Sequence, residues 1–242
     1  PAFQLTAENA GSVIEICRRL DGLPLAIELA AARVRLLNVA DIAARLDHSL
    51  QLLARGAAGA PLRHQTLRAA IDWSYDLLPA SERTLLGRLA VFAGDFTLQA
   101  AETICAGDGL PAAAILDMLA GLLDKSLVVV AVYEGGRGQP TRYRLLEIVR
   151  QYGEEKLATS GAAARLLERH FTWCLALAEA AAPELKGRAG LLWLEQLDRE
   201  HDNLRSALRW GLAQGRKVEV LRLSAALHWY WDHRGYLSEG RA

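Results

Sequence analysis

The stretch that decides the fold runs Ser126-Leu-Val-Val-Val-Ala-Val-Tyr133, then Glu134-Gly-Gly-Arg-Gly-Gln-Pro140, then Thr141-Arg-Tyr-Arg-Leu-Leu146. The first segment is apolar throughout and rich in valine, whose branched side chain favours strands. The glycines and the proline of the second segment predict a flexible turn. The third segment predicts a strand that returns beside the first, so the whole stretch is expected to form a β-hairpin.

Helical patterns lie on both sides of this hairpin. Turn residues separate four segments of helical character before it, and one more helix is expected after it. The expected helices are Thr66–Leu77, Ser81–Phe92, Leu98–Gly107, Pro111–Asp124 and Glu147–Ala158. Helices followed by a terminal hairpin make up the winged-helix plan. Residues 61–160 are therefore predicted to form a winged helix-turn-helix domain with one hairpin.

The segment before this domain, residues 1–60, is expected to be a small helical subdomain. After Thr6, apolar residues recur at helical spacing in a set that comprises Val13, Ile14, Ile16, Cys17 and Leu20. Asp21-Gly22 ends that helix. Pro24 begins the next one, because the first helical turn does not need the N–H that proline lacks. Asn38 or Asp41 is expected to cap a third, short helix that runs to Leu46.

The segment after the domain, residues 161–242, is expected to be helical throughout. Its apolar residues fall on three faces: Leu166, Leu167, Phe171, Cys174, Leu175 and Ala178; Leu191, Leu194, Leu197, Leu204, Leu208 and Leu212; and Val220, Leu223, Leu227 and Trp231. Antiparallel helices joined by short turns are typical of the start of a helical repeat array of the TPR type. The predicted fold class is mainly α.

Composition narrows the class of protein. The chain is 52% hydrophobic and 23% charged, which is typical of a globular protein, and its formal net charge is zero. It has no apolar run long enough to cross a membrane and does not open with a signal peptide or with Met, so we expect a segment of a longer, cytoplasmic protein. Cys17, Cys105 and Cys174 are widely spaced, which indicates reduced thiols and not a disulfide framework.

Gly22-Leu23-Pro24-Leu25-Ala26 is the most informative short motif. It combines a chain break with a helix that begins at proline, and the N-terminus of a helix attracts the phosphates of a nucleotide. Such a motif is also an ordinary turn between two helices. The order of the motifs around it favours nucleotide contact over an ordinary turn.

Four stretches occur in the order found in one family. They are Gly22-Leu-Pro-Leu-Ala-Ile-Glu-Leu-Ala-Ala31, Arg63-His-Gln-Thr-Leu-Arg-Ala-Ala-Ile-Asp-Trp-Ser-Tyr75, Leu89-Ala-Val-Phe-Ala-Gly-Asp-Phe96 and Tyr143-Arg-Leu-Leu-Glu-Ile-Val-Arg-Gln-Tyr152. Together they resemble the NB-ARC group of STAND nucleotide-binding regulators, most closely the bacterial AfsR- and LuxR-like proteins. The resemblance covers residues 1 to about 157 and identifies the first segment with the ARC-like helical subdomain.

The resemblance implies a site for ADP or ATP. In the family the Gly-Leu-Pro-Leu loop lies over the adenine, so Gly22, Leu23, Pro24 and Leu25 are expected to contact the nucleotide. Leu146 stands where full family motifs carry a histidine that contacts phosphate, and leucine cannot donate a hydrogen bond there. Arg144 or Arg150 could take that role, although a helical arginine is more often an ion-pair partner.

The resemblance also implies a switch that controls transcription. ADP would hold this segment against an upstream nucleotide-binding domain that supplies Mg²⁺, and exchange for ATP would release the winged helix and allow nucleotide-dependent self-association. An inducer or protein partner is expected on the helical repeats, and DNA is expected to bind a domain outside this chain. The full-length parent is expected to be a slow ATPase.

This chain by itself is not expected to be an enzyme. No Gly-x-x-x-x-Gly-Lys-[Ser/Thr] phosphate loop occurs in it. The nearest imitation, Gly121 to Ser126, lacks the second glycine and follows a helix instead of a strand. His170 and Cys174 lie one helical turn apart, but a structural metal site needs two more ligands, so a packed cysteine beside a surface histidine is the preferred interpretation. The run Trp229-Tyr-Trp231 is expected to be repeat core.

Two alternatives belong to other classes of function. The first is a DNA-binding winged-helix transcription regulator, and the second is a protein-interaction scaffold without a ligand. Residues 62–160 contain 10 Lys/Arg and 12 Asp/Glu, a net charge of −2. The helix Pro111–Lys125, in the position that reads DNA, carries Asp117 and Asp124 and is expected to be buried, whereas a groove-reading helix presents basic or amide side chains. The hairpin contributes Arg137, Arg142 and Arg144, which could contact phosphate but could equally belong to a solvated turn.

Overall fold

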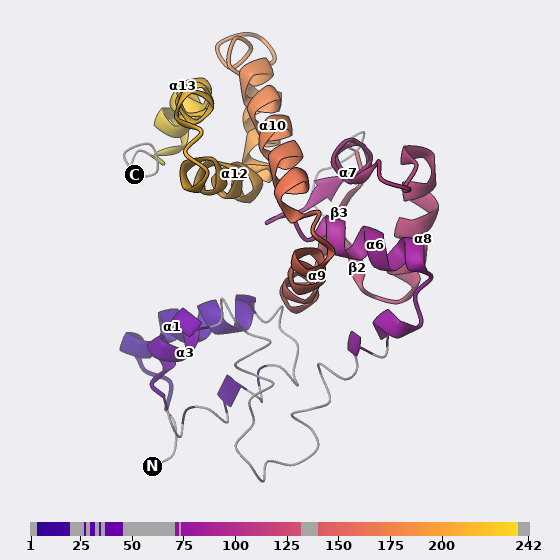
Figure 1. The fold of residues 1–242 in the computed structure, drawn as a ribbon. Coiled ribbons are helices and arrows are strands. Elements are labelled where there is room, and N and C mark those ends of the chain that lie inside the picture. Colours follow the sequence, from indigo (N-terminus) through magenta and orange to yellow (C-terminus); the bar gives the residue numbers. More distant parts are fainter. Residues whose placement is uncertain are drawn as a thin grey trace.

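A computed structural model describes residues 4–19, 37–45, 74–131 and 140–236, together with positions 27, 30, 31, 34, 71 and 72. The fold is mainly α, with one small antiparallel sheet, which confirms the predicted class (Figure 1). None of the helices in the described part of the chain is long and apolar enough to cross a membrane.

The first described region contains α1 (Ala7–Arg19) and α3 (Val39–Arg45), which pack against each other. Asn38 caps α3, because its side-chain oxygen accepts a hydrogen bond of 2.8 Å from the Asp41 N–H. This decides between the two caps that the sequence allowed. Ile16 is buried whereas Ile14 is exposed, so the apolar face of α1 is narrower than the sequence pattern indicates.

From α6 onward, the winged-helix region follows the expected order of helices and hairpin, whereas residues 66–70 of the expected helix Thr66–Leu77 lie outside the described residues. Its elements are α6 (Ala80–Leu89), β1 (Phe96–Thr97), α7 (Leu98–Cys105), the 3-10 helix η4 (Ala112–Ala114), α8 (Ile115–Asp124), β2 (Val128–Ala131), β3 (Arg142–Leu145) and α9 (Glu147–Ser160). The hairpin was predicted, but the strand β1 was not. β1 pairs with β3 through Phe96 and Tyr143, so the sheet has three strands in the order β1-β3-β2.

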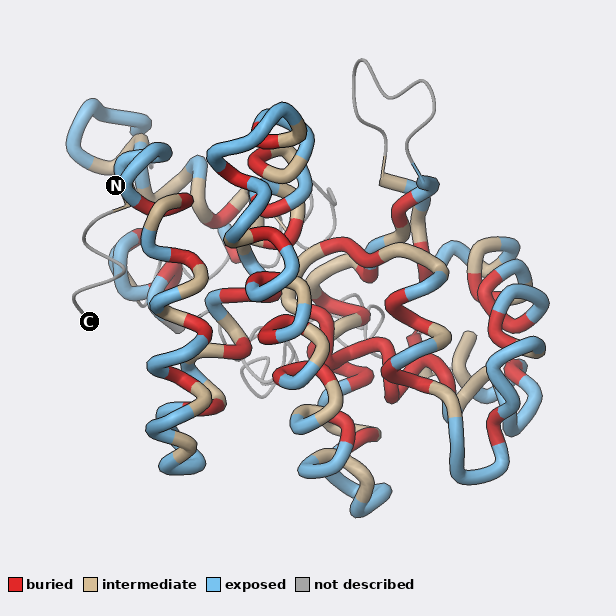
Figure 2. Tube along the Cα trace, turned by 90° about the horizontal axis from the view of Figure 1, so that it is seen from above, coloured by how far each residue is buried: buried red, intermediate tan, exposed pale blue. Residues whose placement is uncertain are grey.

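The core of this region lies between α6, α7, α8 and α9. Glycine at 153 lets α9 approach α6 closely, since a Cβ there would lie 3.0 Å from the Ala90 Cβ and 3.1 Å from the Leu86 carbonyl oxygen. Phe92 stacks on Phe96 with ring centroids 4.6 Å apart, which joins the end of α6 to β1. Figure 2 shows buried and exposed residues alternating along the helices, as expected of amphipathic segments.

The last region consists of α10 (Ala163–Ala181), α11 (Gly190–Arg199), α12 (His201–Ala213) and α13 (Lys217–Arg234), which we call the helical array. It has its own apolar cluster, to which Phe171, Leu204 and Leu227 belong. Tyr230 and Trp231 are buried in this cluster, as predicted for repeat core. Leu191 and Leu212 are exposed, so the second predicted apolar face holds only in part.

Candidate functional site

Most of the residues predicted to bind nucleotide cannot be placed. Gly22, Leu23, Pro24 and Leu25 lie outside the described residues. Arg144 lies on β3, where it is exposed and is paired in register with Val129 of β2. The nucleotide site therefore stays a prediction.

Leu146, at the position where the motif of the resembled family carries a histidine, directly precedes helix α9. Leu146 has an extended backbone (φ −61°, ψ 142°), and its carbonyl accepts from the N–H groups of Val149 and Arg150 at 2.9 and 2.8 Å. Arg150 forms ion pairs with Glu147 at 2.7 Å and with Glu154. Burial alone would lower the pKa of Arg150, but the hydrogen bonds and charges of the two carboxylates raise it. Arg150 is thus an ion-pair partner, as the sequence favoured.

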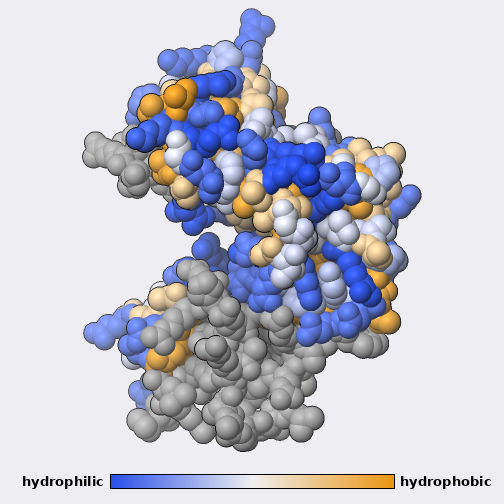
Figure 3. All heavy atoms as spheres, viewed as in Figure 1, coloured by the Kyte–Doolittle hydropathy of each residue, from blue (hydrophilic) through white to orange (hydrophobic). Residues whose placement is uncertain are grey.

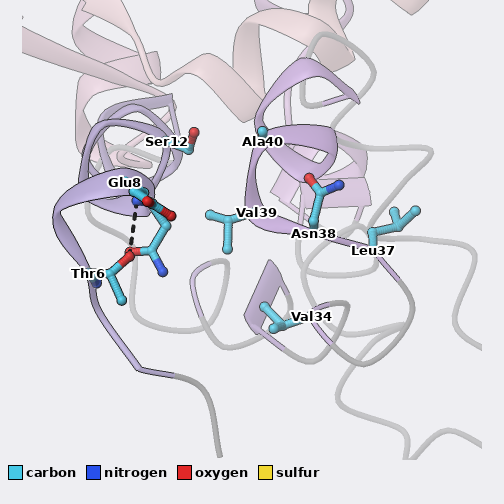
Figure 4. A pocket seen from close by; sticks show the side chains of 9 residues that line it. Thr6, Glu8, Ser12, Val34, Leu37, Asn38, Val39 and Ala40 are labelled. Atoms are coloured by element: carbon cyan, nitrogen blue, oxygen red, sulfur yellow. Dashed lines mark hydrogen bonds between the residues drawn. The ribbon is translucent and has the colours of Figure 1, made fainter.

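A pocket of about 580 Å³ lies between the beginnings of α1 and α3 (Figure 4). Thr6 and Asn9 cap α1 at its edge, where the Thr6 hydroxyl accepts from the Asn9 N–H at 3.4 Å. The described lining residues include Glu8 and apolar residues such as Val34 and Val39, and none of them is basic. The Glu8 carboxylate would repel a phosphate group in this pocket.

The helix that would read DNA presents an unsuitable surface. Along α8, Ile115, Met118, Leu119 and Leu122 are buried. The opposite face is exposed and consists of Leu116, Asp117, Ala120 and Asp124. Our expectation of a buried helix was therefore wrong: small and apolar residues on the exposed face gave the sequence the appearance of a core helix. This face offers no donor to a base edge or a phosphate, and its carboxylates repel the DNA backbone.

Two basic residues near α8 are paired with carboxylates of this chain. Lys125, which follows α8, forms an ion pair of 3.2 Å with Glu82 on α6. Arg142, for which the sequence left open a phosphate contact or a solvated turn, is only 4% exposed. It lies on β3 at the base of the hairpin and points into the junction with the helical array, which the sequence could not show. Arg137 lies outside the described residues.

Arg142 is the centre of a buried polar cluster that joins the winged helix to the array. Its Nε donates to Asp95 Oδ1, and its Nη2 donates to the Asp95 carbonyl at 3.1 Å and to Glu200 Oε1 at 2.6 Å. Asp95 precedes β1, whereas Glu200 begins α12. We call Asp95, Arg142, Glu200 and Asn203 the polar junction.

Asn203 completes the polar junction from α12. Its side-chain NH₂ donates to the Asp95 carbonyl at 2.9 Å and to Glu200 Oε2 at 2.7 Å. Its side-chain oxygen accepts from the N–H groups of Ala93 and Gly94 at 3.0 and 3.2 Å. One amide therefore satisfies both donors and acceptors of the loop between α6 and β1, which is what a buried polar group requires.

The charges of the polar junction are mutually dependent. Burial alone would lower the pKa of Arg142, but the charges of Glu200 and Asp95 raise it. Burial raises the pKa of Glu200 more than the attraction of Arg142 lowers it. A buried arginine between two carboxylates is stable only while both partners stay in place, so the junction resists separation of the two regions.

A second set of contacts links the array to the turn between α7 and α8. This turn holds three residues with positive φ, namely Gly107 (96°), Asp108 (49°) and Gly109 (82°). Arg88 of α6 donates to the carbonyls of Cys105 and Gly107, both at 2.6 Å. From α10, Arg169 donates to the Ala106 carbonyl and Arg165 forms an ion pair of 2.5 Å with Asp108.

Figure 3 shows strongly hydrophilic side chains gathered where α10 adjoins the winged helix. Through Arg165 and Arg169, the first helix of the array contacts the turn of the helix-turn-helix unit.

His170 lies beside the polar junction and is buried, not at the surface as predicted. Its ring meets Phe92 edge to face at 5.6 Å, and its Nε2 lies 3.8 Å from Cys174 Sγ. Burial lowers the pKa of His170 to about 4, against the opposing effect of a hydrogen bond with Asn203. Among the described residues there is no group of three or more side chains that could hold a metal ion.

Comparison with known proteins agrees with the architecture. Residues 78–158 match the winged helix-turn-helix domain family. Proteins of Mycobacterium bovis and Mycobacterium tuberculosis, provisionally named HTH-type transcriptional regulators, are each 45% identical to this chain over 240 residues, which cover 99% of this chain and 26% of theirs. An uncharacterized protein of Mycobacterium tuberculosis is 48% identical over 169 residues, 69% of this chain and 42% of that protein.

The chain spans about a quarter of the length of the first two relatives. No solved structure gives a significant match. The chain therefore contains a winged helix-turn-helix domain and is similar to HTH-type transcriptional regulators.

Proposed function

We propose that this chain is the regulatory winged-helix segment of a transcriptional regulator that acts in the cytoplasm. Similarity to HTH-type transcriptional regulators over 99% of the chain supports the class of protein. Within it, the winged helix serves as a relay that the helical array holds in place, and DNA is bound by another part of the protein.

One observation carries the relay role. The exposed face of α8 has Leu116, Asp117 and Asp124 where a DNA reader needs basic or amide side chains. The same domain uses its buried arginine, Arg142, to bind Glu200 of the array. Among the described residues, the buried polar side chain of β3 is thus directed toward another part of the chain, which supports the relay role.

Direct DNA binding by the winged helix is the second candidate. The winged helix-turn-helix match and the names of the relatives favour it over a nucleotide-dependent switch. On this view the exposed Arg144 of β3 and the wing would contact phosphates while α8 stays away from the bases.

A titration of fluorescently labelled duplex DNA with the full chain separates the two candidates. The affinity is measured at several salt concentrations, for the chain as it is and for Arg144→Gln. A protein that neutralises phosphates loses affinity steeply between roughly 50 and 200 mM salt. The relay role predicts no saturable, salt-dependent binding. Saturable binding that weakens with salt and with Arg144→Gln would establish DNA binding by this domain.

Dependence on ADP or ATP is a further part of the proposal and rests on the sequence resemblance. The matches described above name no nucleotide-binding domain. Gly22, Leu23, Pro24 and Leu25 would pack on the base, with Arg144 near the phosphates and Mg²⁺ held by an upstream domain. Calorimetry of ADP binding to a chain extended upstream tests this. Leu23→Asp should weaken binding, and unchanged affinity would refute the role of the loop.

A further inference from the structure

A second pocket lies where the winged-helix domain meets the first helix of the helical array. It has a volume of about 300 Å³ and is formed by α6, the end of α9 and the beginning of α10. Its charged lining residues are Arg83, Arg88, Lys156 and Arg165, with Asp108 as the carboxylate among the described lining residues. Four cations and one anion give the lining a net charge of +3. Such a surface attracts a compact anion and repels a cation.

Two of these cations are held by neutral groups. The Nζ of Lys156 lies over the rings of Tyr75 and Tyr152, 4.9 and 4.8 Å from their centroids. Arg83 donates to the carbonyls of Leu78 at 2.9 Å and Asp76 at 2.6 Å, and also lies over the Tyr75 ring at 5.4 Å. Ring faces and carbonyls orient a cation without cancelling its charge, so both side chains stay available to an anion.

Arg88 is held in the same way at the inner wall of the pocket. Its side chain donates to carbonyls of the α7–α8 turn, and the residue is only 5% exposed. Burial lowers the pKa of Arg88, while Asp108 and Cys105 act in the opposite direction. A buried cation next to a cavity is stabilised by an anion that enters it.

Arg165 is the cation of the pocket that is paired with a carboxylate. Its partner Asp108 lies 2.5 Å away, and the two side chains are 50% and 44% exposed. An exposed pair of this kind contributes little to stability, so a dianion can displace Asp108 from Arg165. Asp108 belongs to the turn between α7 and α8, so such a displacement would reach the helix-turn-helix unit directly.

We propose that this pocket binds a small phosphate-bearing molecule, with Arg83, Lys156 and Arg165 as the contacts to the phosphate. Guanidinium groups bind phosphate oxygens through paired hydrogen bonds, and the lysine ammonium adds a point charge. The pocket volume lies at the lower end of the range for drug-sized ligands, which begins at about 300 Å³. It is therefore large enough for a phosphate or diphosphate group. The recessed position of Arg88 favours a small ligand over the rigid backbone of a duplex. The bound anion regulates the α7–α8 turn by changing the contacts that Arg165 and Arg169 of α10 make with it.

Inorganic pyrophosphate, without added metal, is the probe for this proposal. Its binding to the full chain is measured by calorimetry at constant ionic strength and compared with sodium chloride in a thermal-shift assay. The variants are Lys156→Met, which keeps the aliphatic stem over the two rings, and Arg83→Met. The matched control is Arg222→Gln, because Arg222 lies on α13 and pairs with Glu179 on the array.

We expect pyrophosphate to bind the chain and the control variant equally. Loss of one charged contact should raise the dissociation constant roughly tenfold or more in Lys156→Met and in Arg83→Met. Circular dichroism establishes that each variant is folded, and Lys156→Arg should restore most of the affinity. Equal affinity in all folded variants would overturn the proposal, as would a thermal shift that chloride reproduces. Binding of duplex DNA that requires Lys156, without binding of pyrophosphate, would also overturn it.

Discussion

The charged side chains on the outer face of α8 are exposed to solvent, whereas those of the polar junction are buried. On α8, Asp117 and Asp124 face the solvent beside Leu116. At the junction, Arg142 and Glu200 are removed from water and make several hydrogen bonds. Burying charges is costly unless each finds its partner, whereas exposed charges of this kind contribute little to stability. This contrast supports the proposal that the array holds the winged helix, because the buried charges of the winged helix are paired with α12.

The largest expected effect comes from removing the central cation of the junction. Arg142→Met leaves Asp95 and Glu200 buried without a counter-charge, which should lower the free energy of unfolding by about 3–5 kcal/mol. Urea denaturation followed by circular dichroism measures it. The control is Arg144→Met on the same strand, where the side chain is exposed, so its loss should change stability by at most about 1 kcal/mol. An equal loss of unfolding free energy in the two variants would contradict a special role of Arg142.

A pH-dependent effect of similar size is expected from His170. Its pKa is lowered by burial to about 4 from an ordinary value of 6.5, so the folded state favours the neutral ring. The stability that depends on it is complete above pH 6.5 and is lost as the pH falls from 6.5 toward 4. The loss should reach roughly 3 kcal/mol, since each pKa unit corresponds to about 1.4 kcal/mol.

The unfolding of His170→Gln between pH 7 and 4, relative to the wild type, isolates this contribution from that of the carboxylates. A constant difference between the two proteins over that range would show that His170 does not titrate with folding.

A smaller effect is expected from the amide that completes the junction. Asn203→Ala leaves the N–H groups of Ala93 and Gly94 without the amide oxygen that they bind, and it removes one of the donors to the Asp95 carbonyl. Unsatisfied buried groups should lower the free energy of unfolding by about 1–3 kcal/mol. Asn203→Asp keeps the acceptor but adds a negative charge beside Glu200, so it should be at least as destabilising as alanine. A stabilising effect of aspartate would contradict the charge balance described for the junction.

The smallest effect is expected on the outer surface of the array. Arg222 donates to both carboxylate oxygens of Glu179 at 2.8 and 2.9 Å, but its side chain is 54% exposed. Arg222→Gln should therefore change the free energy of unfolding by at most about 1 kcal/mol. Urea denaturation at low and high salt measures it. A loss as large as that of Arg142→Met would break the contrast between buried and exposed pairs.

The fold could be predicted from periodicity because most of its elements are long. The valine-rich composition of the strand and the helical spacing of apolar residues on either side predicted these elements. β1 was missed because two residues, Phe96 and Thr97, are too few to show alternation. α8 was taken for a buried helix because Leu116 and Ala120 on its outer face resemble core residues.

The polar junction could not be predicted because its members are far apart in the sequence. Arg142 lies 47 residues from Asp95 and 58 from Glu200. Glu200 and Asn203 belong to the polar run Asp198-Arg-Glu-His-Asp-Asn203, so their polarity did not distinguish them from exposed neighbours. His170 was taken for a surface residue because polarity was the only guide to its exposure. Local patterns reveal elements, whereas contacts between distant polar residues depend on how the elements pack.

Hydrogen–deuterium exchange of Glu200→Gln tests the central claim, that the array holds the winged helix through the polar junction, most directly. This change keeps the shape of the side chain and removes the charge that Arg142 binds. We predict that peptides covering residues 93–97 and 142–145, on the winged-helix side, lose protection together with peptides covering α12, while Arg222→Gln changes neither. Loss of protection confined to α12 would contradict the account, because the winged helix would then be independent of the array.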